Sequence, residues 1–361
     1  MKTKLFEPPY GGMEDQNKKE RTVRVCEWQR RRTGREIMCT AIAFQSKDFY
    51  FGRNLDLEYS YHEEITITPR NYPFHFCKAA DMPKHYAMIG MAYVVEDYPL
   101  YYEATNEKGL SMAGLNFPEN ADYKPYVEGK DNVASYEFIP WILGSCATIE
   151  QAREKLSKIN LVAISFSDQL PPSPLHWIIS GKDGSLTVES VRDGLKVYDN
   201  PVGILTNNPT FDYHMTNLAN YMNLTSEAAV NRMTDKITLK PYSRGMGAMG
   251  LPGDLSSASR FVKAAFTKLN SVCGESEEES VSQFFHLLGS VEQQRGCVHM
   301  GEGKYEVTIY SSCCNADRGI YYYTSYDNRQ ITAVDMRKED LEGQNVIVYP
   351  LLDRQNIFYQ N

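Results

Sequence analysis

The sequence lacks several features that would assign a protein to a class at once. It contains no uncharged apolar run of about 18 residues, which a transmembrane helix needs, and its N-terminus has no apolar core of a secretory signal. The eight cysteines form no C-x-x-C pair and no zinc-type spacing with histidine, and the adjacent Cys313 and Cys314 are poorly placed to bridge each other. We therefore expect a cytoplasmic protein with reduced thiols, no membrane association, no metal and no cofactor.

The chain also lacks an excess of positive charge, since 46 Asp and Glu against 38 Lys and Arg give a formal net charge of −8 at pH 7. Nucleic-acid binding depends on clustered Lys and Arg, so we expect no nucleic-acid partner. An anionic ligand would have to be held by local groups rather than by the overall field. With 361 residues and 42% hydrophobic content, the chain can bury a large core in one big domain or two ordinary ones.

Residues 1–37 differ in character from the rest of the chain. They contain ten Lys and Arg against six Asp and Glu, Pro8-Pro9, Gly11-Gly12 and the run Arg30-Arg31-Arg32. This composition predicts a disordered basic extension, solvated rather than bound to an acidic partner. Gly34-Arg35-Glu36 can be encoded by the purine-rich codons of a ribosome-binding site. We therefore hypothesise that Met38 is the true start and that residues 38–361 form a single domain.

The stretch Met38-Cys39-Thr40 opens the first apolar run of that domain. If Met38 is removed, Cys39 carries both a thiol and a free α-amine, whose reference pKa values of about 8.5 and about 7.7–8.0 let the amine accept the thiol proton. The alternative is a cysteine that acts as a small buried hydrophobe. The nucleophile interpretation predicts a mature chain that begins at Cys39.

Apolar periodicity predicts strands at both ends of the domain and helices in the middle. Strand patterns occur at 39–67, 86–95, 109–115, 175–180, 185–191, 195–205, 305–312, 319–326 and 330–336. Helical patterns occur at 135–159, after an N-cap at Ser257, and at 279–291. This order favours an α+β fold of antiparallel sheets with helices packed on them over a repeating βαβ unit. The G-x-G-x-x-G pattern at 245–250 has no preceding strand and no following helix, so we interpret it as a loop.

Polar side chains stand at five further positions of interest. Arg53 and Asp56 lie three residues apart at the end of the second strand, and either form a surface ion pair or hold the thiolate and the α-amine of Cys39. Asn116 and Asn207 follow strands and are compatible with ordinary turns. Arg260 lies near a helix N-terminus, which is unfavourable for a cation and suggests another purpose.

Six segments together resemble the choloylglycine (bile salt) hydrolases, which share the N-terminal-nucleophile superfamily with penicillin V acylases. They are Met-Cys-Thr at 38–40, Phe-Gly-Arg-Asn-x-Asp at 51–56, Asn-Glu-Lys-Gly-Leu at 106–110, Ala-Gly-Leu-Asn-Phe-Pro at 113–118, Leu-Thr-Asn-Asn-Pro-Thr-Phe-Asp at 205–212 and Gly-Leu-Pro-Gly-Asp-Leu-Ser-Ser-Ala-Ser-Arg-Phe at 250–261. The resemblance covers residues 38–361. It implies a four-layer αββα sandwich, usually a homotetramer, that hydrolyses glycine or taurine conjugates of bile acids in the cytoplasm of a gut bacterium.

The resemblance also implies roles for individual residues. Cys39 is the nucleophile, Asp56 orients its amine, Arg53 and Arg260 flank the thiol, and the Asn116 N–H and the Asn207 amide hold the oxyanion. A steroid substrate calls for an apolar pocket, for which the candidates are Leu55, Tyr59, Phe138, Ile139 and Trp141, with Arg53 and Asn116 also contacting substrate; core packing is the alternative for the apolar five.

One departure and two alternatives complete these expectations. The hairpin from Cys39 to Arg53 is two residues shorter than the resemblance leads us to expect, but a two-residue change preserves which face each side chain occupies. A penicillin V acylase or another N-acyl amide hydrolase is the runner-up, although that resemblance would place a tyrosine at Asn116. An unprocessed, non-catalytic bile-acid-binding protein is the alternative outside enzymes.

Overall fold

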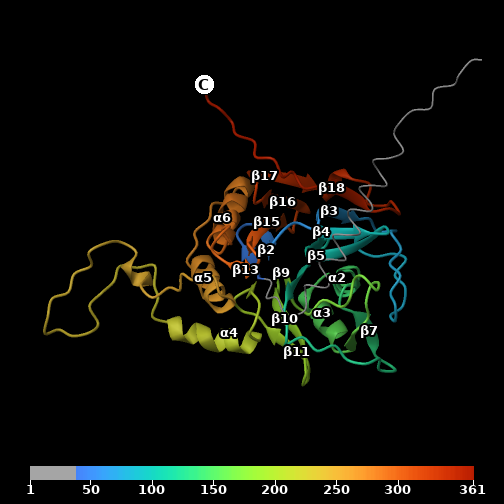
Figure 1. Ribbon diagram of the computed structural model, residues 1–361, viewed down its shortest axis with the longest axis horizontal. Coiled ribbons are helices and arrows are strands. Elements are labelled where there is room, and N and C mark those ends of the chain that lie inside the picture. Colours follow the sequence, from blue (N-terminus) through green and yellow to red (C-terminus); the bar gives the residue numbers. More distant parts are fainter. Residues whose placement is uncertain (1–37) are drawn as a thin grey trace, which may run out of the picture.

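The computed structural model describes residues 38–361. The expectation of a disordered extension at 1–37 lies outside the described residues. Residues 38–361 contain two large antiparallel sheets that pack face to face (Figure 1). This confirms the α+β architecture predicted from the strand pattern.

Sheet A has the strand order β12-β1-β2-β15-β16-β17, and sheet B has the order β11-β10-β9-β6-β5-β4-β3-β18. The strands of sheet A are β1 (Cys39–Gln45), β2 (Phe49–Leu57), β12 (Ile204–Leu205), β15 (Val307–Asn315), β16 (Ile320–Ser325) and β17 (Asn328–Asp335). Those of sheet B are β3 (Glu64–Thr68), β4 (Met88–Val95), β5 (Tyr98–Asn106), β6 (Ser111–Asn116), β9 (Leu175–Gly181), β10 (Gly184–Val191), β11 (Gly194–Asp199) and β18 (Ile347–Pro350). Two small sheets pair β7 (Asp131–Ala134) with β8 (Ile159–Val162) and β13 (His299–Gly301) with β14 (Lys304–Tyr305).

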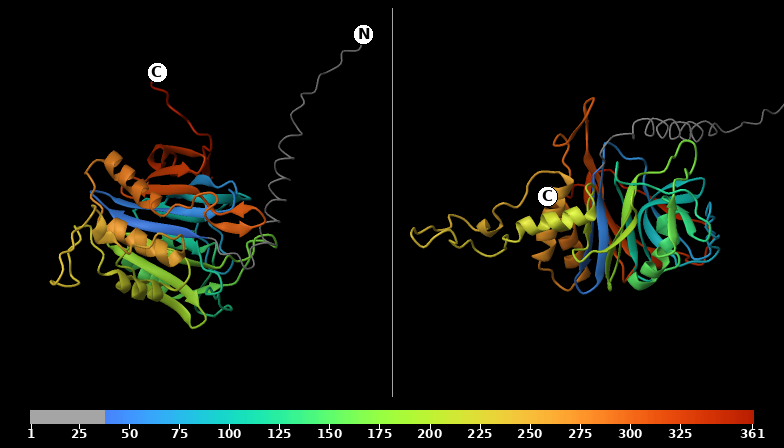
Figure 2. Two further views of the ribbon diagram at one scale, coloured as in Figure 1. Left: turned by 60° about the vertical axis from the view of Figure 1, so that its left-hand side comes forward. Right: turned by 90° about the horizontal axis from the view of Figure 1, so that it is seen from below.

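Helices cover the outer faces of both sheets and complete the four layers (Figure 2). α5 (Ser257–Leu269) and α6 (Glu277–Gly289) pack on sheet A, and α4 (Phe211–Leu218) lies beside α5. α2 (Phe138–Leu143) and α3 (Ile149–Leu156) pack on sheet B. One buried apolar cluster joins the sheets to α5 and α6, and a second joins sheet B to α2 and α3. Burial on both faces explains why β1 and the first three residues of β2 are mostly apolar.

Several predicted boundaries were wrong. The N-cap of α5 is Ser256, not Ser257, because Ser256 accepts the Ser259 N–H, whereas the Ser257 hydroxyl accepts the Asn207 N–H at 2.8 Å. The segment 135–159 divides into α2 and α3, and α6 begins at Glu277, where Ser276 and Glu279 form a capping box. The strand pattern at 195–205 divides into β11 and β12, which belong to different sheets. Strand β5 was missed, and the 245–250 segment is a loop with one short 3-10 turn, as predicted.

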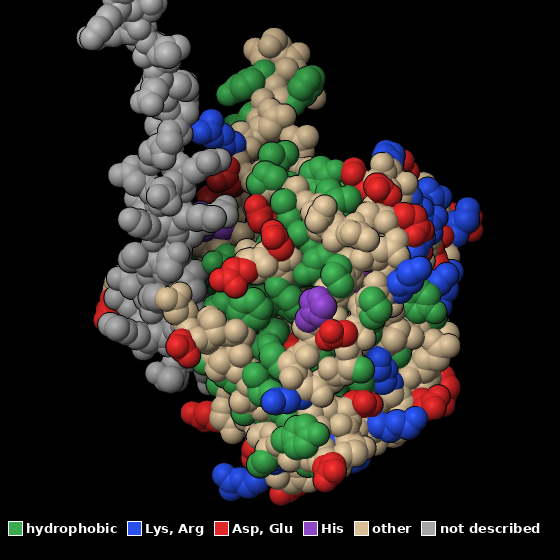
Figure 3. Space-filling model, turned by 90° about the vertical axis from the view of Figure 1, so that its right-hand side faces the viewer, with side chains coloured by type: hydrophobic (Ala, Val, Ile, Leu, Met, Phe, Trp, Pro, Cys, Tyr) green, Lys and Arg blue, Asp and Glu red, His purple; other side chains and the backbone are tan. Residues whose placement is uncertain are grey.

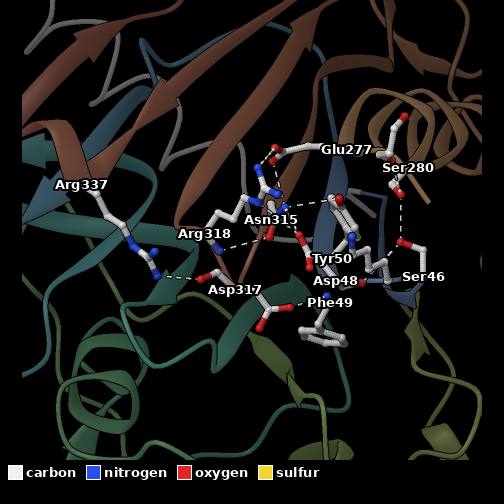
Figure 4. Close-up of polar contacts among 12 residues, drawn as sticks. Ser46, Asp48, Phe49, Tyr50, Glu277, Ser280, Asn315, Asp317, Arg318 and Arg337 are labelled. Carbon is white, nitrogen blue, oxygen red and sulfur yellow. Dashed lines mark hydrogen bonds and ion pairs between the residues drawn. The ribbon is translucent and has the colours of Figure 1, made fainter. Parts of the chain in front are cut away.

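The turn between β1 and β2 is short and is held from outside by a polar cluster (Figure 4). The Asn315 amide donates to Asp48 at 2.9 Å and to Glu277 at 2.8 Å, and Arg318 pairs with both carboxylates. The Ser46 and Ser280 hydroxyls lie 2.9 Å apart, joining the same turn to α6. Such a network fixes the turn without a glycine. The register of β2 against β1, and with it the position of Arg53, is therefore well determined.

The segment between α4 and α5 projects from the body as a long arm, drawn in yellow and gold (Figures 1 and 2). It carries exposed apolar side chains, including Met222, Met233 and Tyr242. Elsewhere, on the face that carries segment 69–87, hydrophobic side chains run through the middle and many Lys and Arg side chains gather toward one edge (Figure 3). Among residues 38–361, no helix has the length and apolar character needed to cross a membrane.

Candidate active site

Cys39 is the first residue of β1 and lies in the interior of the sandwich, with 2% of its surface exposed. Its Cα partner on β2 is Leu55, and the pair Ala41–Arg53 follows two residues along. Positions two apart on a strand share a face. Cys39 and Arg53 therefore lie on the same face of sheet A, the one turned toward sheet B, as the parity argument for the short hairpin predicted.

The Arg53 guanidinium crosses the space between the sheets. Its Nη1 donates to the Gly114 carbonyl at 2.6 Å and to the Tyr102 carbonyl at 3.2 Å, both on sheet B. Its Nε lies 3.9 Å from a carboxylate oxygen of Glu103. Arg53 is 1% exposed, so these contacts fix a buried positive charge beside the thiol rather than a surface ion pair.

Glu103, on β5, is the centre of a buried polar network that no sequence pattern indicates. Its two oxygens accept from the Tyr310 hydroxyl at 2.7 Å, the Ser312 hydroxyl at 3.0 Å and the Tyr321 hydroxyl at 2.5 Å. These donors come from β15 and β16 of the opposite sheet. A buried charge needs such partners, so Glu103 ties the two sheets together behind Arg53.

The other face of β2 turns toward the helices and carries Asp56, which is fully buried. One of its carboxylate oxygens accepts from the Thr308 hydroxyl at 2.6 Å, and the other is buried without a hydrogen-bond partner among residues 38–361. Burial raises the pKa of Asp56 to about 6, while Arg260, Thr308 and Arg53 oppose that rise. The backbone N–H of Asp56 donates to the Met38 carbonyl at 3.2 Å. Asp56 thus lies beside the peptide bond that joins Met38 to Cys39.

Arg260 reaches the start of β1 from the first turns of α5. Its guanidinium donates to the Cys39 carbonyl, to the Thr40 hydroxyl and, at 2.8 Å, to the Asn207 side-chain oxygen. It is 1% exposed and its charge interacts with Asp56 and Glu306. Burial lowers the pKa of Arg260, and the neighbouring Asp56 and Glu306 side chains oppose that fall.

Asn207 connects Cys39, Arg260 and Asn116. Its side-chain oxygen accepts the Cys39 N–H at 2.7 Å, and its amide nitrogen donates to the Asn116 carbonyl at 2.8 Å. An amide NH₂ has two hydrogens, so one donor remains after the bond to Asn116. Asn116 ends β6 and is 5% exposed. Both asparagines are buried, and they are joined to each other and to the nitrogen of Cys39, so neither is an ordinary surface turn residue.

Two buried histidines support the segment that carries Asn207, and sequence reasoning missed both. His176 contacts the Thr206 carbonyl at 2.9 Å and Glu189 at 3.1 Å. His214 contacts the Asn207 carbonyl at 2.9 Å, and burial lowers its pKa to about 4. A sequence offers no signal for such contacts, because the partners are 30 and 7 residues away along the chain.

The reactivity of the Cys39 thiol depends on opposing effects. Burial raises its pKa, and the Asp56 carboxylate raises it further, whereas Arg53, the Asp56 backbone N–H and Arg260 lower it. With Met38 attached, the nitrogen of Cys39 is an amide and carries no charge. A free α-ammonium at that nitrogen would add a third positive group and favour the thiolate.

An apolar cavity adjoins Arg53 on the side of sheet B. Its lining includes Tyr102 and Gly114, whose carbonyls accept from Arg53, and it is completed by aromatic and aliphatic side chains such as Tyr136, Ile139, Phe166 and Leu170. Of the five predicted apolar pocket residues, Ile139 lines this cavity. Phe138 and Trp141 belong to the core under α2, Leu55 belongs to the core of sheet A, and Tyr59 packs on Tyr61, a lining residue.

Residues 38–361 contain no cluster of three or more His, Cys, Asp or Glu side chains that would hold a metal ion. The positions of Cys39, Arg53, Asp56, Asn116, Asn207 and Arg260, which the sequence scatters over 222 residues, instead form one constellation around a thiol. Such a group has the parts of a nucleophile with donors for a developing oxyanion.

Known proteins resemble this chain over most of its length. The model of the family of linear amide C–N hydrolases, choloylglycine hydrolase family, matches residues 39–349. A bile salt hydrolase/transferase of Lactiplantibacillus plantarum is 55% identical over 324 residues, which cover 90% of this chain and 100% of that protein. A bile salt hydrolase/transferase of Clostridium perfringens is 39% identical over 86% of this chain and 96% of its own length.

Solved structures of related proteins are similar to this chain in fold. The crystal structure of a variant of conjugated bile acid hydrolase from Clostridium perfringens has a TM-score of 0.82 at 37% identity, covering 90% of this chain and 100% of that chain. Penicillin V acylase from Agrobacterium tumefaciens has a TM-score of 0.68 at 20% identity, covering 86% of this chain and 90% of that chain. The latter shows a shared fold.

Proposed function

The chain belongs to the choloylglycine hydrolase family of linear amide C–N hydrolases, and on that basis we propose that it cleaves the amide bond between a bile acid and glycine or taurine. The observation that carries the proposal is the group of Arg53, Asp56, Asn207 and Arg260 around the buried thiol of Cys39. This group belongs to a chain that matches a bile salt hydrolase/transferase over 90% of its own length and 100% of that protein's length.

The proposed mechanism begins with a chain that starts at Cys39. The α-amine accepts the thiol proton, and the sulfur attacks the amide carbon of the substrate. The tetrahedral intermediate expels glycine or taurine, whose nitrogen receives the proton from the α-ammonium, and a thioester remains on Cys39. The α-amine then activates a water molecule, which attacks the thioester and releases the bile acid and the free thiol.

Each neighbouring residue has a part in that sequence. The Asn116 N–H and the free hydrogen of the Asn207 amide donate to the oxyanion, while Asp56 orients the α-ammonium. Arg53 and Arg260 stabilise the thiolate, and Arg53 also contacts the substrate at the mouth of the cavity. The contacts that support these roles are those of Arg53 with the Gly114 carbonyl at 2.6 Å, of the Cys39 N–H with Asn207 at 2.7 Å and of the Asp56 N–H with the Met38 carbonyl at 3.2 Å.

The apolar cavity is the proposed site of the steroid. Its lining combines aromatic and aliphatic side chains with few polar groups, which suits a rigid apolar substrate. Gly114 lines the cavity and its carbonyl is also the acceptor for Arg53, so a steroid bound there would lie close to Arg53.

Two related activities are separate candidates. A thioester reacts with amines as well as with water, so transfer of the bile acid to an amino acid is a second candidate, and several relatives bear the name hydrolase/transferase. Penicillin V acylase activity is disfavoured by asparagine at position 116. A non-catalytic bile-acid-binding protein would retain Met38 and bind conjugates without turnover.

We also propose that the enzyme is a cytoplasmic homotetramer in which the arm between α4 and α5 contacts another subunit. The support is the set of exposed apolar side chains on this arm, which include Met222, Met233 and Tyr242, since exposed apolar patches mark interaction sites. Sedimentation of the intact protein would give the mass of a monomer if this is incorrect.

The test of the function is an assay of glycine and taurine release from glycocholate and taurocholate, with penicillin V as a third substrate. We expect release from the bile acid conjugates and none from the Cys39→Ala variant. Hydrolysis of penicillin V in preference to both conjugates would favour the acylase, and binding without release would favour the non-catalytic alternative.

A further inference from the structure

Glu306 is a buried carboxylate at the site that the proposed mechanism does not use. It lies between β14 and β15 and is 1% exposed. One of its oxygens accepts the backbone N–H of Met38, and its own N–H donates to the Val298 carbonyl at 3.0 Å. Met38 directly precedes Cys39, so this carboxylate lies one residue from the nitrogen that becomes the α-amine.

Met38 is held from two sides. Glu306 accepts its N–H, and the backbone N–H of Asp56 donates to its carbonyl at 3.2 Å. The peptide nitrogen that follows, that of Cys39, is bonded to Asn207 at 2.7 Å. The two carboxylate residues therefore flank the Met38–Cys39 bond, and a buried oxygen of Asp56 has no hydrogen-bond partner among residues 38–361.

The charged groups around Glu306 are mixed in sign. Burial raises its pKa to about 8, and the Asp56 and Glu58 carboxylates add to the rise, whereas the Met38 N–H and Arg260 oppose it. Removal of Met38 takes away the hydrogen bond to Glu306 and creates one positive charge at Cys39. A cation at that point lies near both carboxyl groups, compensates their burial and so favours their ionised forms.

We propose that Glu306 is a positioning residue that, together with Asp56, holds the α-ammonium of Cys39 in the mature enzyme. The proposal rests on the proposed N-terminal nucleophile and adds a second carboxylate to its amine site. A negative charge near the ammonium favours the protonated amine, and it disfavours the thiolate. Glu306 thereby sets the pH range in which the thiol of Cys39 loses its proton while the α-amine stays protonated.

The experiment compares the wild-type chain with Glu306→Gln, Glu306→Asp and Glu58→Gln. Glu58→Gln is the matched control, because Glu58 contributes charge in the same neighbourhood but Met38 donates to Glu306. Intact mass establishes the first residue of each purified chain. Selective ¹⁵N-cysteine labelling then gives the pH titration of the α-amine, and kcat/KM for glycocholate is measured from pH 4 to 9.

We expect Glu306→Gln to begin at Cys39 and to shift both the amine midpoint and the acid limb of kcat/KM downward by about one pH unit. Glu306→Asp keeps the charge and should shift both less, and Glu58→Gln should leave them near the wild-type values. If Glu306→Gln does not fold, Glu306→Asp provides the test instead. Its shorter side chain displaces the carboxylate, so the midpoint of the α-amine titration should still differ from that of the wild type.

Other results would overturn the proposal. These are an unchanged amine midpoint in a processed Glu306→Gln chain, an equal shift in Glu58→Gln, or a Glu306→Gln chain that alone retains Met38, which would assign Glu306 to leader removal instead. A wild-type chain that retains Met38 would overturn it too. Since the amine titration needs no turnover, an enzyme inactive on conjugates would refute the proposed function and still test the role of Glu306.

Discussion

Arg53 and Cys39 lie on the same face of neighbouring strands, with Arg53 paired to Ala41 and Cys39 paired to Leu55. This relationship places a buried guanidinium, fixed by two carbonyls of the opposite sheet, beside the thiol. Asp56, three residues after Arg53, points to the other face. Because Arg53 and Asp56 are three residues apart on one strand, they lie on opposite faces of the sheet. Arg53 therefore lies on the side of the Cys39 thiol, and Asp56 lies on the side of the Cys39 nitrogen.

Replacing Arg53 should lower the reactivity of Cys39. Burial raises the thiol pKa and Arg53 is the largest opposing influence, so Arg53→Gln should raise that pKa and reduce kcat/KM by about 100-fold at neutral pH. The pH dependence of iodoacetamide alkylation at Cys39, followed by peptide mass spectrometry, measures the shift. Arg337→Gln is the control, since Arg337 contacts Asp317 in the distant turn cluster. A wild-type alkylation profile for Arg53→Gln would contradict this account.

The amide of Asn207 should contribute mainly to the transition state. Asn207→Asp keeps an oxygen for Cys39 and Arg260 but removes the NH₂ group, so kcat should fall by about 10²- to 10³-fold with little change in KM. Steady-state kinetics with glycocholate measures both constants. A variant with raised KM and unchanged kcat would assign Asn207 to substrate binding instead.

Glu103 should matter for stability as well as for activity. Glu103→Ala leaves Arg53 and two buried tyrosines without their shared acceptor, which should cost about 3–5 kcal/mol of unfolding free energy. Tyr321→Phe removes one hydrogen bond and should cost about 1–2 kcal/mol. Urea unfolding measures both losses, and equal losses for the two variants would show that the charge of Glu103 is not what stabilises the sheets.

His214 should make the protein less stable in mild acid. Its pKa is lowered to about 4 by burial, while the unfolded chain titrates near 6.5, so the unfolded state binds more protons between these values. Stability should therefore fall as pH drops from about 6.5 to 4, by up to about 3 kcal/mol from this group. His214→Gln keeps a donor for the Asn207 carbonyl and should flatten that dependence. Unfolding curves at pH 7 and pH 5 test this, and a parallel fall in the variant would exclude His214 as the cause.

Substitutions at two residues of α2, Ile139 and Trp141, should have different effects. Ile139 lines it, whereas Trp141 packs in the core under sheet B. Ile139→Phe should fill part of the cavity and raise KM for bile acid conjugates several-fold, with kcat nearly unchanged. Trp141→Phe should leave KM unchanged and lower stability by about 1–3 kcal/mol. If KM rises only for Trp141→Phe, the steroid site lies elsewhere.

The sequence was most informative where a short-range pattern decides the structure. The alternation of β1 and β2 placed Arg53 on the face of Cys39 despite the short hairpin, and the order of strands and helices predicted the packed antiparallel sheets. Strand β5 was missed because its mixed residues, Tyr98–Asn106, alternate imperfectly around Glu103. That carboxylate is satisfied only by hydroxyls from another sheet, about 200 residues later in the chain.

Capping and support residues were harder to predict for a similar reason. Ser256 and Ser257 are equivalent by pattern, and the contact of Ser257 with the Asn207 N–H decides which one caps α5. His176, His214 and Glu306 act on backbone groups of residues far away or next to Cys39. Such partners come together only in the folded protein, so these contacts cannot be predicted from the periodicity or the composition of the sequence.

The central claim is that Cys39, as the first residue of the mature chain, is its own nucleophile and base. The most direct test is the intact mass of the purified protein, measured on the same sample as glycine and taurine release. The account predicts a mass that begins at Cys39, together with activity. A protein that retains Met38 and still hydrolyses the conjugates would contradict it, because the nitrogen of Cys39 would then be an amide, which is not basic and cannot accept the thiol proton.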